Sequence, residues 1–177
     1  LYVEQGASYN LRYELSADSI FMERGYYSSF GTTTLMEKAE TLRVTGSELT
    51  NKDLSLIIKR SISGVITLPD NSQQANGISI IASNDSGDYS VTVNVPKGKR
   101  TADYNLYVPA GKGYIIRYEL HSNSEIAPVG YYSEMTSEAV RDINDAKIID
   151  LSQLDADNIN FKMLQNRTIS GKIRLLE

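Results

Sequence analysis

The sequence predicts an all-β protein made of tandem antiparallel β-sandwich repeats. Three observations carry this prediction. Apolar and polar residues alternate through nearly every segment, clusters of Gly, Pro, Asn and Asp separate the segments, and the chain resembles itself after about 105 residues. Alternation with a period of two is typical of strands that bury one face. The repeat length suits an independently folded domain better than one turn of a solenoid.

Three pairs of segments carry the repeat: LYVEQGASYNLRYEL at 1–15 with LYVPAGKGYIIRYEL at 106–120, GYYS at 25–28 with GYYS at 130–133, and RSISGVITL at 60–68 with RTISGKIRL at 167–175. The first two pairs have an offset of 105 positions and the third has an offset of 107. The difference indicates a two-residue insertion in a loop, where insertions are tolerated.

The position of the ISG strand sets the predicted domain boundaries. If this strand opens each unit, residues 1–60 are the C-terminal part of one repeat, 61–167 form a complete repeat, and 168–177 begin a third. Leu176 and Glu177 also match a common vector-derived tail. Strand 54–58 is followed almost at once by strand 62–68, so the link at Arg60-Ser61 is short, and we expect consecutive units to form a stiff rod.

Each complete repeat is expected to hold about seven strands arranged as two sheets. The residues expected to point inward are Ile62, Gly64, Ile66 and Leu68; Ile78, Ile80 and Ala82; Val91, Val93 and Val95; Tyr104, Leu106 and Val108; Tyr114, Ile116, Tyr118 and Leu120; and Ile159, Phe161 and Met163. In the first copy the corresponding inward set is Tyr9, Leu11, Tyr13 and Leu15. Helix is limited to a turn or two around 134–146.

Composition argues against several functional classes. The net charge is −4 and the 18 Lys and Arg residues are scattered, so we expect no nucleic-acid partner. The absence of Cys excludes disulfides and Cys-based metal sites. No apolar run approaches the length of a membrane span, and the first residues do not resemble a signal peptide, so we expect no membrane insertion and a chain that begins inside a longer protein.

No catalytic constellation is recognisable. His121 is the single histidine, it has Ser16 as its first-copy counterpart, and no nucleophile motif accompanies it, so we expect a non-enzyme. Calcium is the only cofactor considered, because it binds clustered carboxylate and carbonyl oxygens. The candidate ligands are Asp155, Asp157 and Asn158, although turn formation explains these residues better.

Tyrosine dominates the aromatic residues, with 12 Tyr against 3 Phe and no Trp. Sugar rings stack on exposed aromatic planes, and adjacent strand residues point to opposite faces. One member of each GYYS pair is therefore expected to be exposed, and the candidate ligand-binding residues are Tyr26, Tyr27, Tyr131 and Tyr132. A tyrosine that hydrogen-bonds a loop at the end of the sandwich explains GYYS equally well.

The order of these motifs carries a family resemblance. The motifs are, in order, ISGVITLPD, YNLYVPAGKGYIIRYEL, GYYS, and an AKIIDLS…INFKML pair. A chain with this order resembles the carboxypeptidase regulatory-like or prealbumin-like sandwich repeats, and through them the B-type stalk repeats of bacterial adhesins. The resemblance implies an extracellular or bacterial cell-surface location and a structural or adhesive role as a stalk or spacer. Neighbouring repeats are the implied partners, with a host or cell-wall glycan or protein as a further candidate. The alternative is a carbohydrate-binding module of a secreted polysaccharide-degrading enzyme that uses exposed Tyr.

Overall fold

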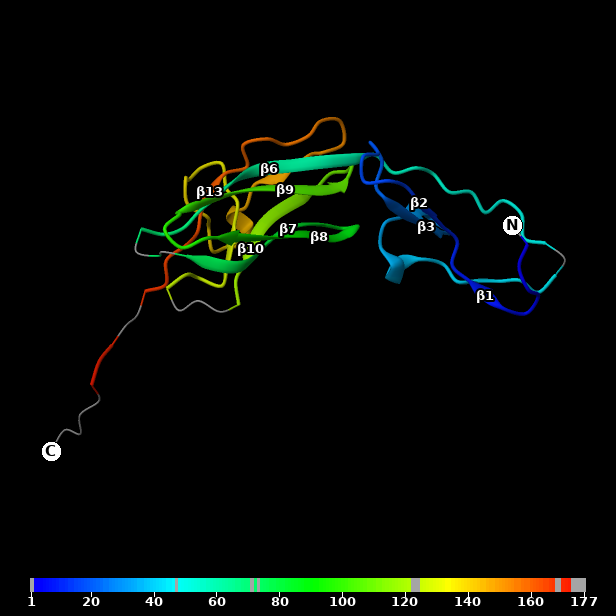
Figure 1. Cartoon of the computed structure of the whole chain (residues 1–177), viewed down its shortest axis with the longest axis horizontal. Helices are drawn as coiled ribbons and strands as arrows, with labels where there is room; N and C mark the ends of the chain where they lie inside the picture. Colours follow the sequence, from blue (N-terminus) through cyan, green and yellow to red (C-terminus); the bar gives the residue numbers. More distant parts are fainter. Residues whose placement is uncertain are drawn as a thin grey trace.

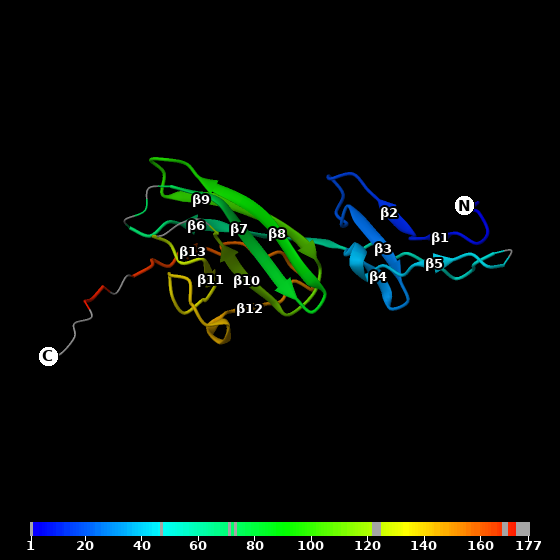
Figure 2. The same ribbon diagram turned by 90° about the horizontal axis from the view of Figure 1, so that it is seen from below.

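The computed structural model describes residues 2–46, 48–70, 72, 74–121, 125–167 and 170–172. The chain is all-β, as predicted. Helix among these residues is limited to two single 3-10 turns, η1 (Met36–Lys38) and η2 (Ile143–Asp145), and no helix there is long and apolar enough to cross a bilayer. Figures 1 and 2 show two bodies arranged end to end, which we call the N-terminal unit (residues 2–58) and the C-terminal unit (residues 59–167).

The C-terminal unit has the layout of a two-layer β-sandwich. One sheet has the order β11-β10-β7-β8, with β12 also paired to β10, and the other has the order β13-β6-β9. The strands are β6 (Lys59–Thr67), β7 (Ala75–Asn84), β8 (Gly87–Val95), β9 (Thr101–Pro109), β10 (Tyr114–Glu119), β11 (Val129–Tyr131), β12 (Ile148–Ile149) and β13 (Phe161–Lys162). All of these pairings are antiparallel except β13 with β6, which is parallel.

The predicted inward residues form the core between these two sheets. Ile62, Ile80 and Tyr118 are completely buried, and nearly all the other members of the predicted set are buried with them. Phe161 is 2% exposed, and its ring lies 5.9 Å from that of Tyr118 in a stacked arrangement. Because burying one large apolar side chain contributes roughly 1.5–3 kcal/mol, this continuous core stabilises the C-terminal unit independently.

The N-terminal unit consists of two small sheets and lacks a second layer among its described residues. β1 (Ser8–Tyr9) pairs with β5 (Leu42–Arg43), and β2 (Arg12–Glu14), β3 (Arg24–Ser28) and β4 (Gly31–Thr33) form the order β2-β3-β4. Its predicted inward residues, Tyr9, Leu11, Tyr13 and Leu15, are only half-buried. Half-buried core positions are expected of a sheet with one face uncovered.

Contacts in the N-terminal unit have counterparts in the C-terminal unit at the offsets found in the sequence. The amide of Ile57 donates to the Tyr13 hydroxyl, and the amide of Leu164 donates to the Tyr118 hydroxyl. The same holds for three backbone pairs: Leu15 N to Glu23 O with Leu120 N to Pro128 O, Tyr27 N to Leu11 O with Tyr132 N to Ile116 O, and Met22 N to Ile57 O with Ala127 N to Leu164 O. These shared contacts identify which residues of the two units are structurally equivalent.

The predicted strand at 54–58 is wrong. Residues 51–57 form no strand, and the amides of Ser55 and Ile57 bond to side chains, Thr32 Oγ1 and the Tyr13 hydroxyl. The equivalent residues of the C-terminal unit include β13, which is a strand because β6 lies beside it. No described strand takes the place of β6 in the N-terminal unit, so a ladder partner is missing there.

The link between the units also differs from the prediction. We expected a short connection at Arg60-Ser61, whereas β6 begins at Lys59 and passes through both residues without a break. Of the predicted third repeat at 168–177, only residues 170–172 are described, and they are not in a strand. Residues 168–169 and 173–177 lie outside the described residues.

Candidate functional site: the joint between the units

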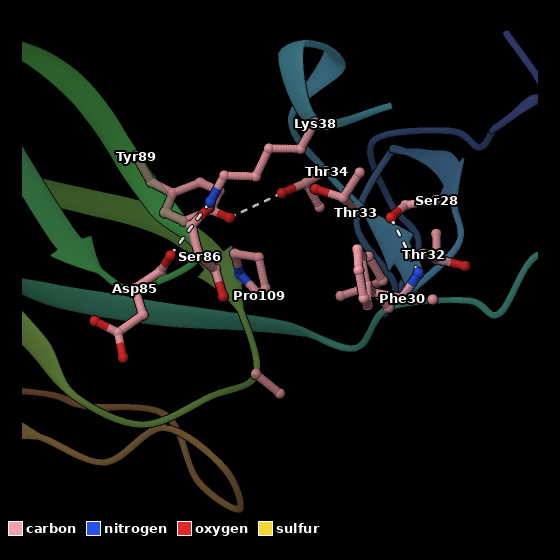
Figure 3. Close-up of a pocket in the computed structure, with 13 residues that line it drawn as sticks. Ser28, Phe30, Thr32, Thr33, Thr34, Lys38, Asp85, Ser86, Tyr89 and Pro109 are labelled. Carbon is pink, nitrogen blue, oxygen red and sulfur yellow. Dashed lines mark hydrogen bonds between the residues drawn. The ribbon is translucent and has the colours of Figure 1, made fainter. Parts of the chain in front are cut away.

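The most elaborate contact outside the core joins the two units. A cavity of about 590 Å³ lies between them and is lined by residues of both, including Phe30, Thr34 and Lys38 from the N-terminal unit and Asp85, Ser86, Tyr89 and Pro109 from the C-terminal unit (Figure 3). The joint is built from the segment 34–38, which follows β4, and from the turn between β7 and β8.

Lys38 connects η1 to the β7–β8 turn by hydrogen bonds. Its Nζ donates to the backbone carbonyl of Ser86 at 2.6 Å and to that of Asp85 at 3.2 Å, as Figure 3 shows. Asn84 shapes the turn, because its side-chain oxygen accepts from the amides of Ser86 and Gly87. The two carbonyls therefore point outward together and receive the ammonium group of the other unit.

A hydroxyl pair and an apolar contact accompany the lysine. Thr34 Oγ1 and the Tyr89 hydroxyl share a hydrogen bond of 2.8 Å. Burial raises the pKa of Tyr89, and the Thr34 hydrogen bond opposes that rise, so the phenol stays protonated at neutral pH. Leu35 packs over Gly87, where a Cβ would lie 2.2 Å from Leu35 Cδ1 and the φ angle is +148°. The φ angle favours glycine there, and any larger residue would also displace the Leu35 side chain.

The start of β6 forms the other half of the joint. The Lys59 amide donates to the Ile20 carbonyl, and the Ala110 amide donates to the Ile58 carbonyl. Lys59 Nζ donates to the Ala17 carbonyl at 2.7 Å and lies 4.8 Å from the ring centre of Tyr107, within cation–π range. The connecting chain is therefore held by both units and contains no hinge loop.

The four candidate tyrosines do not provide the open platform that we expected. Tyr26 and Tyr132 are buried, and Tyr27 and Tyr131 are half-buried. Lys52 covers the ring of Tyr27, with Nζ 5.0 Å from the ring centre and 3.2 Å from the hydroxyl. Neither pair therefore has the fully exposed member that we expected, in β3 of the N-terminal unit or at β11 of the C-terminal unit. Ligand binding by these residues stays a prediction.

The candidate calcium ligands lie along β6. Asp155 Oδ1 accepts from the Ser61 amide at 3.0 Å, and Asp157 Oδ1 accepts from the Ser63 hydroxyl at 2.7 Å. Asn158 has a φ of +61°, so it serves as a turn residue. Among the described residues, no group of three or more acidic or histidine side chains is arranged to hold a metal ion. These residues therefore support the edge of a strand, and calcium binding stays a prediction.

The exposure of Arg117 differs from what the sequence predicts. It alternates with the inward residues Ile116 and Tyr118, so the sequence pattern places it on an outward, exposed face, yet its side chain is only 18% exposed. It bonds Glu119 at 2.8 Å, Asp88 at 3.0 Å and the Ser83 hydroxyl. Its N-terminal counterpart Arg12 is 51% exposed. The difference arises because β7 and β8, which carry Ser83 and Asp88, have no described counterpart beside β2.

The joint was not recognisable from the sequence. Its residues are separated by about 50 positions, and neither periodicity nor a motif marks them. Comparisons with protein-family models, with curated proteins and with solved structures found no match to this chain. The family resemblance therefore stays a prediction from the sequence motifs.

Proposed function

We propose that this chain is a non-enzymatic structural spacer, in which successive all-β units are joined stiffly in a stalk at the outer surface of a bacterium. The observation that carries the proposal is the joint. Two separate groups of contacts, one at η1 and the β7–β8 turn and one at the start of β6, fix the units at two points. A body held at two separated points resists both bending and rotation.

The energetics support stiffness. A net hydrogen bond contributes about 0.5–1.5 kcal/mol, and 1.4 kcal/mol changes a population tenfold. Bending the units apart at η1 breaks the Lys38 and Thr34 contacts and exposes Leu35 at the same time. The bent state is therefore a minor population, and the units keep one relative orientation.

The equivalent hydrogen bonds within the two units also support the proposal. Equivalent hydrogen bonds at fixed offsets are what two copies of one repeat would make. The location at a bacterial surface rests on the sequence resemblance alone. The carbohydrate-binding alternative requires an open aromatic surface, and the burial of the GYYS tyrosines gives it no support.

Small-angle X-ray scattering on the full chain tests the proposal. We expect the native chain to fit one arrangement of the two units, and the double variant Leu35→Ser, Lys38→Ala to require a mixture of arrangements. Lys97→Ala, which removes an exposed lysine distant from the joint, is the control. Native scattering that requires a broad mixture would contradict the spacer. Retardation of the chain in a polysaccharide affinity gel would favour the carbohydrate-binding alternative.

A further inference from the structure

Two neighbouring cavities at the joint lie on either side of the hydrogen bond between Thr34 and Tyr89. The first cavity is the one of about 590 Å³ in Figure 3, and the second cavity measures about 630 Å³. Residues of both units line each of them, and Thr34 and Tyr89 line both. All of the lining residues lie between positions 14 and 110, and each volume lies within the usual range of about 300–1,000 Å³ for ligand sites.

An exposed aromatic ring lies at the rim of the first cavity. Phe30 is fully exposed and sits at the tip of the two-residue turn between β3 and β4, where its amide donates to Ser28 Oγ at 3.3 Å. A turn this short has few conformations, so it holds the ring in place. Pro109 of the C-terminal unit lines the same cavity and is buried (Figure 3), and Ile57 and Ala110 complete the apolar lining. The first cavity therefore offers a ligand an aromatic ring and a rigid apolar wall.

The polar lining of the first cavity offers hydrogen-bond donors. Ser28 Oγ and Thr33 Oγ1 each accept from a backbone amide two residues farther along, and no described residue accepts from either hydroxyl, so each keeps a hydrogen to donate. Lys38 uses two of its three N–H bonds on the carbonyls of the β7–β8 turn. Figure 3 shows the Asp85 carboxylate directed away from Lys38 and Phe30. The first cavity thus suits a ligand that accepts hydrogen bonds and has none to donate.

The second cavity adds negative charge. Glu23 and Glu37 line it, both are exposed, and neither forms an ion pair with a described residue. The two cations of this lining are engaged elsewhere, Arg24 by Glu14 at 3.1 Å and Lys59 by a backbone carbonyl. The exposed apolar and aromatic residues of the lining are Met36 and Tyr107. Two unpaired carboxylates beside apolar surface favour a positively charged side chain with an apolar stem.

We propose that the two cavities bind a proline-rich segment of a partner protein, with a Lys or Arg residue next to the prolines. Such a segment forms a polyproline II helix, whose carbonyls are free to accept hydrogen bonds and whose prolines have no N–H to donate. It docks on aromatic surfaces at a low cost in entropy, because the helix is already formed. The prolines contact Phe30 in the first cavity, and the basic residue lies near Glu37 in the second. The four prolines of this chain are scattered singly, so the occupant is a separate protein.

Fluorescence anisotropy with synthetic peptides tests the proposal on the full chain. The probe is a labelled peptide of eight prolines followed by two arginines, and two comparison peptides replace the prolines by alanine or the arginines by glutamate. We expect the native chain to bind the probe and to bind each comparison peptide roughly tenfold or more weakly. Phe30→Ala should weaken binding of the probe by roughly tenfold, because the aromatic contact is lost. Phe30→Tyr keeps the ring and should bind the probe as the native chain does.

Met135 provides a matched control. It follows GYYS at the position equivalent to Phe30 and is 93% exposed, so its removal takes the same kind of apolar surface from the other unit. Met135→Ala should leave binding of the probe unchanged. Glu37→Gln should reduce the preference for the arginine peptide over the glutamate peptide by several-fold, because one of the two free carboxylates is lost.

Several results would overturn the proposal. A native chain that does not bind the probe at millimolar concentration, binding that survives Phe30→Ala, or equal binding of the alanine peptide would each do so. Binding of cellohexaose, or self-association, that Phe30→Ala abolishes would assign the first cavity to a glycan or to a second copy instead. The proposal uses the geometry of the joint, which scattering without a peptide tests separately. One arrangement of the units together with no binding of the probe would remove this proposal and leave the spacer standing.

Discussion

Weakening the joint is expected to loosen the N-terminal unit while leaving the C-terminal unit unchanged. The four predicted inward residues of the N-terminal unit are only half-buried and the unit contributes no residue to the buried core cluster, so it depends on its neighbour, whereas the C-terminal unit has its own closed core. The double variant Leu35→Ala, Lys38→Ala removes a half-buried apolar contact and two exposed hydrogen bonds to the β7–β8 turn. We expect each of the two substitutions to cost about 1 kcal/mol, or about 2 kcal/mol together.

Amide hydrogen exchange measures this effect, because the two units contain matched amides. A loss of about 2 kcal/mol should speed exchange of the Leu15 and Tyr27 amides by roughly 30-fold. Their equivalents, the amides of Leu120 and Tyr132, make the same hydrogen bonds inside the closed unit and should exchange at the native rate. Equal acceleration in both units, or no acceleration in the first, would refute the dependence of the N-terminal unit on the joint.

Further predictions concern stability. Phe161→Ala should cost about 3–5 kcal/mol in urea unfolding, because it empties the centre of an aromatic cluster; a cost below about 1 kcal/mol would place the ring outside the core. Arg117→Ala should cost about 1–3 kcal/mol and Arg12→Ala under about 1, because only Arg117 is mostly buried with several partners; equal costs would contradict this difference. Gly64→Ala should lower the thermal midpoint, because its Cβ meets the Ile159 carbonyl, and an unchanged midpoint would count against the close approach. Burial raises the pKa of Tyr118 to about 12, above the ordinary value near 10 of an unfolded chain. Its contribution to stability is complete below pH 10 and falls by roughly 1.4 kcal/mol per pH unit as the pH rises toward 12, so Tyr118→Phe should reduce the alkaline slope of the unfolding free energy.

The sequence pattern predicted the strands and core of the C-terminal unit because alternation depends directly on burial. Ile62, Ile80 and Tyr118 lie on inward positions of a period-two pattern, and the structure buries all three. The same rule overestimated the exposure of Arg117, since periodicity gives the face of a strand but not the side chains that cover that face. The covering residues, Ser83 and Asp88, come from other strands.

The joint had no sequence signal for a related reason. Lys38 binds backbone carbonyls, which every residue has, so nothing in the side chains of Asp85 and Ser86 marks them as partners. The Asn, Asp and Gly cluster at 84–88 predicts a turn, and the structure has a turn there, but a turn pattern does not reveal what docks on it. Gly87, which Leu35 approaches closely, is the one residue here whose type fits a close contact. A glycine in a turn is explained more simply by its backbone freedom.

A distance distribution between two spin labels tests the central claim, that the units are joined stiffly, most directly. The chain has no native Cys, so Thr41→Cys and Thr92→Cys, both at exposed positions in different units, can be labelled specifically. Double electron–electron resonance on the doubly labelled chain should give one narrow distribution, which broadens when Leu35→Ala and Lys38→Ala are added. A broad distribution in the chain with an intact joint would contradict the stiff spacer.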